Sequence, residues 1–308
     1  MNPSVWLPDP DQLMSTRVAD LMTTVGMPID PNDIDGSVRR FVRWSQQHPE
    51  RFWPAVLDDL GVVWSRNYSQ VVDLSAGPEW ADWFPGGETN IAMNCLDIPA
   101  AEMPDDLALI AEDEDGNSRR WSFGDADREV QRLAQLLSGL GIERGDRVAC
   151  LMPMVGEVVF AMLATMKIGA IFIPIFSGYA PPSVRERLED SGARLLFTAD
   201  VGKRRGRQFD LKSQADMAVD GLETLQHQVV LRRGDGEAPM TEGRDLWWQD
   251  AVASVEGDSC TAMMAAMDPA LMIYTSGTTG KPKGTVHTHA GCLAQMGKEV
   301  RYNFDVRP

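Results

Sequence analysis

The chain lacks the features that mark membrane, secreted and nucleic-acid-binding proteins. None of its apolar runs reaches the ~18 residues that predict a membrane-spanning helix. Its first residues contain no basic segment followed by an apolar one, so no secretory signal is predicted. Basic residues are scarce: 29 Lys and Arg stand against 45 Asp and Glu, and the formal net charge of −16 argues against a general nucleic-acid or anionic-membrane surface. We therefore expect a cytoplasmic protein with no nucleic-acid partner and no membrane span.

Cysteine and histidine are also rare, which limits metal and disulfide chemistry. The four cysteines are widely spaced, contain no Cys-x-x-Cys pair and are typical of reduced thiols in a cytosolic protein. They are Cys95, Cys150, Cys260 and Cys292. His287 and His289 would point to one face of a strand and could ligate a metal, but no third ligand is evident, so a structural role is favoured. The sequence assigns no metal ligands.

Two common nucleotide-binding patterns are absent from the most informative stretch, residues 270–284. It is not a Walker A loop, because Thr275 stands where the first glycine is needed and Pro282 follows Lys281. It contains no Gly-x-Gly-x-x-Gly either. Instead, an apolar run from Ala270 to Tyr274 predicts a buried strand, and a loop rich in hydroxyls and glycines follows it, with lysines at its far end. Such a loop can present N–H groups to an anion and suits a polyphosphate; the alternative is a flexible polar turn.

The sequence Tyr-Thr-Ser-Gly-Thr-Thr-Gly-Lys-Pro-Lys-Gly of residues 274–284 resembles the signature phosphate loop of the acyl-adenylate-forming enzymes. These include acyl-CoA synthetases, luciferases and peptide-synthetase adenylation domains. The resemblance implies that the loop closes over the β- and γ-phosphates of ATP while a carboxylate attacks the α-phosphate, and that Mg²⁺ is required. The phosphate-binding residues that it implies are Thr275, Ser276, Gly277, Thr278, Thr279, Gly280 and Lys283. The catalytic lysine of the family is expected downstream of this chain.

Residues 1–100 form a region rich in tryptophan and phenylalanine, for which a cap over a larger domain is favoured. Helices are predicted at 33–47 and 51–60. The sequences from Trp83 to Asn90 and from Asn94 to Asp97 resemble the pattern Trp-Phe-x-Gly-Gly-x-x-Asn followed by Asn-Cys-x-Asp, which is found in the N-terminal extension of acetyl-CoA synthetases. The resemblance implies an extension over 1–100 and an incomplete AMP-binding domain over 101–308.

Residues 101–308 alternate strands and helices, which predicts an α/β fold with parallel βαβ layers. The acidic run from Glu102 to Gly116 could be suspected of binding metal, but a solvated hairpin tip is favoured. The predicted strands are 107–111, 119–123, 148–152, 171–176, 195–198, 229–231 and 270–274. The predicted helices are 124–139, 156–167, 182–190, 215–225, 247–255 and 290–300.

A second candidate site follows two of these strands. Phe176-Ser-Gly-Tyr179 comes after one strand, and Lys203-Arg-Arg-Gly-Arg207 after the next, with four basic residues in five positions. Arginine's planar fork suits phosphate; the alternative is a solvated basic loop. Both sequences resemble segments of acetyl-CoA synthetases, where Phe-Gly-Gly-Phe and Ala-Asp-x-Gly-x-Arg-x-Gly-Arg bind the nucleotide end of coenzyme A. The resemblance implies that Arg204 and Arg207 face the 3′-phosphate, with Phe176 and Gly178 near the adenine. Ser177 replaces one family glycine.

The resemblance as a whole implies an acid–thiol ligase, an AMP-forming acyl-CoA synthetase. Such an enzyme converts a carboxylate, ATP and coenzyme A to acyl-CoA, AMP and diphosphate. An acetate-like acid is expected; propionate, acetoacetate or a longer acid are alternatives. Later family motifs are not found before residue 308, so we expect an N-terminal fragment without the C-terminal domain, inactive alone and with an open sheet edge. The alternative is a non-catalytic nucleotide- or coenzyme A-binding remnant, or a half-enzyme that needs a separate C-terminal chain.

Overall fold

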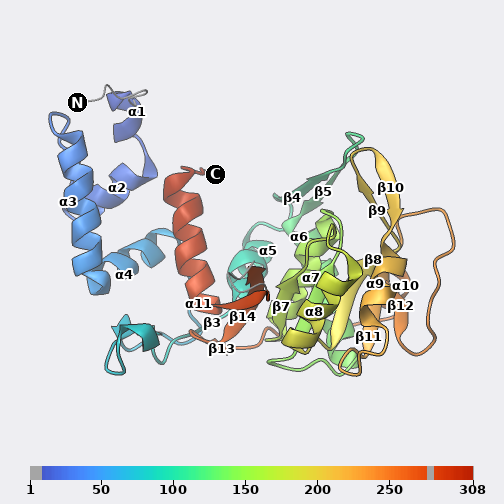
Figure 1. Cartoon of the computed structure of the whole chain (residues 1–308). Helices are drawn as coiled ribbons and strands as arrows, with labels where there is room; N and C mark the ends of the chain where they lie inside the picture. The colour runs from blue at the N-terminus through green and yellow to red at the C-terminus, as the bar shows by residue number, and fades with distance from the viewer. Residues whose placement is uncertain (1–8, 276–280, 308) are drawn as a thin grey trace. The chain divides into compact units, whose positions relative to one another are not determined.

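The computed structural model describes residues 9–275 and 281–307 of the chain (Figure 1). Ser276, Gly277, Thr278, Thr279 and Gly280 of the expected phosphate loop lie outside the described residues. The chain divides into two compact units. The first unit is Met1–Thr89, Ala265–Met267 and His289–Pro308, and the second unit is Asn90–Met264 and Asp268–Thr288.

The first unit is mainly helical and is built on aromatic packing. Asp33, the first residue of the helix predicted at 33–47, caps α3 by accepting a hydrogen bond from the N–H of Gly36. Phe41 of α3 packs edge to face on Phe52 of α4, with 6.1 Å between ring centroids. The elements of the first unit are α1 (Pro10–Met14), α2 (Arg17–Thr24), α3 (Ile34–Gln47), α4 (Pro49–Asp59), β1 (Val72–Asp73), η1 (Pro78–Trp80), β2 (Asp82–Trp83), β3 (Glu88–Thr89), α11 (His289–Gly291), η3 (Cys292–Met296) and η4 (Glu299–Asn303).

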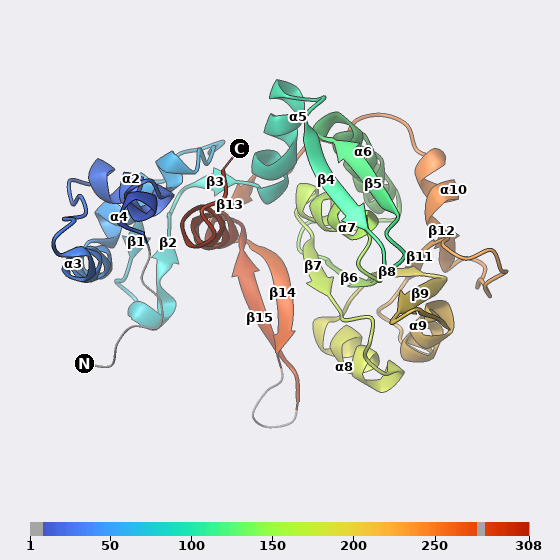
Figure 2. The same cartoon turned by 90° about the horizontal axis from the view of Figure 1, so that it is seen from above.

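The second unit contains a seven-stranded sheet in the order β12-β11-β8-β6-β7-β14-β15. All neighbours in it are parallel except β14 and β15, which form an antiparallel pair. Figure 2 shows α6 and α7 on one side of the sheet and α8 and α9 on the other. The sheet strands are β6 (Arg147–Leu151), β7 (Ile171–Pro174), β8 (Leu195–Ala199), β11 (His227–Leu231), β12 (Asp245–Trp247), β14 (Pro269–Thr275) and β15 (Lys283–Thr288).

Outside the sheet, the second unit carries its helices and two hairpins. One hairpin is β4 (Leu107–Glu112) with β5 (Ser118–Ser122), and the other is β9 (Val201–Arg204) with β10 (Arg207–Asp210). The helices are η2 (Met93–Asp97), α5 (Ile98–Glu102), α6 (Phe123–Gly139), α7 (Gly156–Lys167), α8 (Pro181–Ser191), α9 (Leu211–Val219) and α10 (Trp248–Ala253). The short strand β13 (Met264–Ala265) lies where the chain leaves the unit.

The parallel α/β architecture predicted from strand–helix alternation is confirmed. The apolar strands are buried along nearly their whole length, as a sheet covered on both faces requires. The switch in strand order lies at β6: the chain passes from β6 through α7 to β7 on one side, then through α8 to β8 on the other. The carboxyl ends of the parallel strands therefore meet at one edge, where open α/β sheets bind ligands.

Several local predictions are wrong, each for an identifiable reason. The helix predicted at 215–225 is α9, which starts at Leu211 because Asp210 accepts the N–H of Ser213 and caps it. The chain after Asp220 turns at Gly221, which has φ +66°. The strand β12, before the helix predicted at 247–255, was not predicted at all.

The two histidines do not share one strand face as predicted. β15 ends at Thr288, and His289 begins α11. The helix predicted at 290–300 exists, but two of its segments, η3 and η4, are π-helical turns.

Candidate functional site

Of the seven residues expected to bind phosphate, the structure describes Thr275 and Lys283, which flank the other five. Thr275 is the last residue of β14 and Lys283 is the first residue of β15. They are register partners in the antiparallel pair, so the hydroxyl and the ammonium stand side by side at the carboxyl edge of the sheet. Both residues are exposed. The structure thus places a hydroxyl and a cation together where the expected loop leaves the sheet.

The strand that leads into this loop is anchored to α8. The hydroxyl of Tyr274 donates to Oδ2 of Asp190 over 2.6 Å, and the residue is buried. Burial, then the hydrogen bond to Asp190, raises the pKa of Tyr274, so the phenol remains a neutral donor. The guanidinium carbon of Arg187 lies 5.8 Å from the Tyr274 ring centroid and 4.3 Å from that of Tyr179. A buried arginine of α8 therefore lies between the end of β14 and the turn that follows β7.

The turn after β7 brings together three of the four residues expected to bind coenzyme A. The N–H of Tyr179 donates to the carbonyl of Phe176 over 3.0 Å and closes the turn. The guanidinium carbon of Arg204 lies 5.1 Å from the Phe176 ring centroid, a cation–π arrangement. A Cβ on Gly178 would come within 2.5 Å of Phe176 Cε1 and 2.6 Å of Arg204 Nη1. Glycine at this position therefore allows the close approach of the ring and the guanidinium, which a Cβ would displace.

The fourth residue, Arg207, lies opposite Arg204 in the β9–β10 hairpin. The basic segment was predicted to bind phosphate or to be a solvated loop; it is a hairpin with a two-residue turn. Both arginines are exposed. The pairing places two guanidinium groups at the tip of one hairpin.

A pocket of about 480 Å³ lies between this hairpin and the β4–β5 hairpin. Phe176, Lys203 and Arg204 line it on the basic side, and the acidic residues of the β4–β5 tip line it as well. Sequence reasoning missed two other lining residues, Met154 and Arg233, because they become neighbours only when separate strand ends meet at the sheet edge. An aromatic ring and several cations around one pocket can hold an adenine ring and a phosphate.

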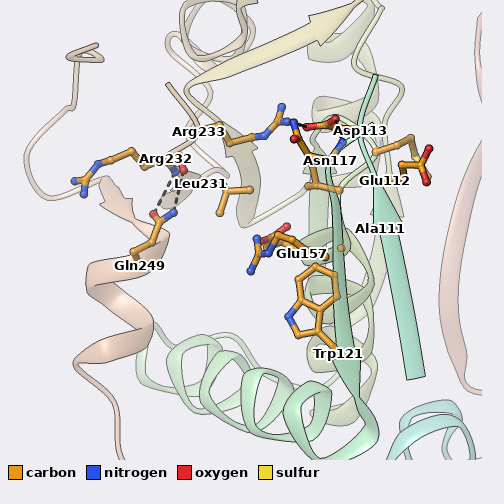
Figure 3. Close-up of a pocket in the computed structure, with 14 residues that line it drawn as sticks. Ala111, Glu112, Asp113, Asn117, Trp121, Glu157, Leu231, Arg232, Arg233 and Gln249 are labelled. Carbon is orange, nitrogen blue, oxygen red and sulfur yellow. Dashed lines mark hydrogen bonds and ion pairs between the residues drawn. The ribbon is translucent and has the colours of Figure 1, made fainter. Parts of the chain in front are cut away.

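A smaller pocket of about 280 Å³ adjoins the first and shares Met154 and Arg233 with it. Figure 3 shows Arg233 extending toward Asp113 and Asn117, with Trp121 and Glu157 on the opposite side. Glu157 accepts a hydrogen bond from Arg119 over 2.7 Å. This pocket extends the polar surface along the carboxyl edge of the sheet.

Asp200, inside the expected coenzyme motif, has a positioning role. It is almost fully buried, and its carboxylate accepts the N–H groups of Val201, Arg233 and Gly234 at 2.6, 2.9 and 3.0 Å. Its carbonyl accepts the N–H of Leu211 at the start of α9. Asp200 thereby joins the loops after β8 and β11 and fixes the direction in which the β9–β10 hairpin leaves the sheet.

The motif residues Asn90 and Asp97 are also structural in the second unit. Nδ2 of Asn90 donates to the carbonyls of Met166 and Ala262, each over 2.9 Å, in a fully buried position. Asp97 accepts a hydrogen bond from Nζ of Lys167 over 2.7 Å. Both contacts lie at the end of α7, away from the carboxyl edge.

Two other features are absent from the described part of the chain. Over residues 9–275 and 281–307, no helix is long and apolar enough to cross a membrane. In the same residues, no group of three or more His, Cys, Asp or Glu side chains is arranged to hold a metal ion.

Comparison with known proteins agrees with the resemblance seen in the sequence. A family model described as acetyl-coenzyme A synthetase N-terminus matches residues 38–95. Acetyl-coenzyme A synthetase 2 of Pseudomonas putida is 37% identical over 270 residues, which cover 87% of this chain and 42% of the relative. Acetyl-coenzyme A synthetase of Escherichia coli K12 is 40% identical over 268 residues, covering 84% of this chain and 40% of the relative.

The solved structure of acetoacetyl-CoA synthetase from Streptomyces lividans matches 98% of this chain with a TM-score of 0.87 and 27% identity, and this chain covers 46% of it. The chain thus spans less than half the length of these relatives, and the match falls on their N-terminal part. A second family model, described as AMP-binding enzyme, matches residues 96–308, which is most of the sequence. The chain belongs to the AMP-binding enzyme family.

Proposed function

We propose that this chain provides the coenzyme A-binding surface and the ATP phosphate loop of an AMP-forming acyl-CoA ligase of the acetyl-CoA synthetase type. The observation that carries the proposal is that Phe176 and Arg204 line one pocket, while Gly178 lies against both side chains and Arg207 pairs opposite Arg204 in the hairpin. The names of the relatives support coenzyme A and a short-chain acid as substrates. We propose residues 1–100 as the extension and 101–308 as the adenylation part, in a cytoplasmic enzyme.

In the proposed reaction a carboxylate oxygen attacks the α-phosphorus of ATP and diphosphate leaves, which gives an acyl-adenylate. The sulfur of coenzyme A then attacks the acyl carbon and AMP leaves. The protein's contribution to such steps is mainly positioning and stabilisation of charge. In this chain, Thr275 and Lys283 flank the loop proposed to hold the phosphates, together with Ser276, Gly277, Thr278, Thr279 and Gly280.

Mg²⁺ is proposed to arrive with ATP. Magnesium is commonly held by substrate phosphates and only one or two carboxylates.

The test is the double variant Arg204→Ala/Arg207→Ala, with coenzyme A binding measured by titration calorimetry. Each charge-assisted hydrogen bond to phosphate contributes about 1.5–3 kcal/mol, so we expect affinity to fall by at least about tenfold. 3′-Dephospho-coenzyme A, which lacks the phosphate, should bind wild type and variant alike. Arg39→Ala is a matched control, because that arginine lies in the first unit and pairs with Asp35. Unchanged affinity of the double variant for coenzyme A would show that the coenzyme binds elsewhere.

A further inference from the structure

The tip of the β9–β10 hairpin is already occupied by an anion from the same chain. Arg205 and Gly206 form its two-residue turn, with φ of +54° and +73°. Such turns leave the N–H groups of both central residues without a partner inside the hairpin. The two oxygens of Glu114 accept them, from Arg205 over 2.9 Å and from Gly206 over 2.8 Å. The turn is therefore an anion-binding concavity that a carboxylate fills.

A second contact joins the same two hairpins. Asp115, next to Glu114, pairs with the ammonium of Lys203. Figure 1 shows the tip of the β4–β5 hairpin beside the tip of β9–β10. The hydrogen bonds from Gly206 and Arg205 lower the pKa of Glu114, so its carboxylate is charged at neutral pH. The acidic tip, Glu114 and Asp115, thus covers the basic hairpin through one doubly bonded carboxylate and one ion pair.

The acidic tip shares a pocket with the residues proposed to bind coenzyme A. Glu114 and Asp115 line the pocket of about 480 Å³ together with Phe176 and Arg204. Arg205 and Gly206 form the turn between Arg204 and Arg207, so a phosphate monoester held by these two arginines would lie next to the N–H groups that Glu114 occupies. Two anions in one concavity repel each other, so a bound phosphate and the carboxylate of Glu114 exclude one another.

We propose that Glu114 is an internal competitor for the phosphate of the coenzyme, and so a specificity-determining residue of this site. A phosphate monoester takes over the N–H groups of Arg205 and Gly206 and displaces the acidic tip. A ligand without that phosphate leaves the tip in place. The inference rests on the proposed coenzyme site and adds a residue to it that the motifs do not indicate.

The experiment compares coenzyme A with 3′-dephospho-coenzyme A by titration calorimetry on the 308-residue chain, on Glu114→Gln and on Glu112→Gln. Glutamine at position 114 keeps the shape and loses the charge, so the phosphate meets a weaker competitor. Since two charge-assisted bonds at an exposed site are lost, we expect coenzyme A to bind about three- to tenfold more tightly, with dephospho-coenzyme A unchanged within about twofold. Glu112→Gln is the matched control, because it removes one charge from the same pocket while Glu114 stays in the turn.

A second readout follows the displaced tip. Hydrogen exchange of residues 112–118 should become faster when coenzyme A binds to the wild type, and should not change with dephospho-coenzyme A. The proposal is overturned if Glu114→Gln leaves the affinity ratio of the two coenzymes unchanged or lowers it, since Glu114 would then be a neutral or supporting contact. It is also overturned if Glu112→Gln tightens coenzyme A binding equally.

The double variant Arg204→Ala/Arg207→Ala separates this result from failure of the proposed function. If the double variant loses coenzyme A binding and Glu114→Gln has no effect, only the proposal that Glu114 competes with the phosphate is refuted. If the double variant binds coenzyme A as the wild type does, the proposed coenzyme A site is refuted, and the proposed role of Glu114 is refuted as well.

Discussion

A buried ion cluster at the start of β12 gives the sharpest test of how the second unit is held together. The side chain of Lys212 in α9 has no exposed surface, and its Nζ lies 2.6 Å from Asp216 Oδ2 and 2.9 Å from Asp245 Oδ2. Arg244 also pairs with both carboxylates at 2.6 Å, and Gln228 donates to Asp216 over 2.9 Å. We predict that Lys212→Met destabilises the unit, because the change keeps an apolar chain of similar length and removes the ammonium.

The size of the expected loss in unfolding free energy depends on the partners that the carboxylates keep after Lys212 is replaced. Removing one partner of a buried ion pair costs about 3–5 kcal/mol when the other charge is left alone. Here the side chain of Asp245 is fully buried but keeps Arg244 and the N–H of Thr241. We therefore expect a smaller loss, about 2–3 kcal/mol in the free energy of unfolding. With a urea slope of about 1–3 kcal/mol/M, the unfolding midpoint falls by roughly 1 M.

The pH dependence of the stability difference provides an independent check that the loss is electrostatic. Burial alone would raise the pKa of Asp245, but hydrogen bonds from Arg244, the N–H of Thr241 and Lys212 outweigh it and lower that pKa. A lowered carboxyl pKa stabilises the fold above the unfolded value of about 3.9, and the stabilisation is lost as pH falls through the folded pKa. The difference between wild type and Lys212→Met should therefore be full at pH 7 and shrink below about pH 4.

The assay is urea unfolding followed by tryptophan fluorescence, with Lys298→Met as control. Lys298 pairs with Glu299 in a half-exposed position of the first unit, where an ion pair contributes at most about 1 kcal/mol. A Lys212→Met variant as stable as the wild type at pH 7, or a difference that does not depend on pH, would refute the electrostatic account.

Three further changes test other parts of the second unit. Gly178→Ala adds a methyl 2.5 Å from Phe176, so calorimetry should show coenzyme A binding about tenfold weaker with little loss of stability; equal affinity would contradict the close packing of the turn. Asn90→Ala removes both donors to buried carbonyls and should lower unfolding stability by about 2–4 kcal/mol, while coenzyme A affinity stays the same. Burial raises the pKa of the Cys150 thiol to about 12. Iodoacetamide on the native chain should therefore alkylate the exposed Cys260 and spare Cys150, as peptide mass spectrometry would show.

Elements with one dominant local signal could be predicted from the sequence. The helix predicted at about 156–167 matches α7, because a segment that is apolar almost throughout begins next to Gly156 and ends before Gly169. The helix α6 was predicted to within a residue by its apolar face and its terminal glycines. Periodicity is strong in such segments because burial fixes one face or the whole helix.

Elements whose signal is short or tertiary could not be predicted in this way. β12 has three residues and pairs in parallel with β11. A segment this short shows no hydrophobic periodicity, so the sequence alone does not predict it. Half of the ten residues of the β9–β10 hairpin are charged, and its turn has Arg205 at a positive φ that favours glycine or asparagine. From the sequence alone this segment is expected to be a basic loop, because the contact between its turn and Glu114 joins residues some 90 positions apart.

The residues that carry the family resemblance divide by position into two kinds. Asn90 and Asp97 bind the end of α7, at the edge of the sheet where strands begin. Phe176 and Arg204 stand at the opposite edge, where strands end and ligands bind. The first kind can identify the branch of the family without touching a ligand, because it fixes how α7 ends. The proposed coenzyme site and Glu114 both lie at the edge of the second kind, so binding experiments on this chain should vary the carboxyl edge and use the other edge as a control for stability.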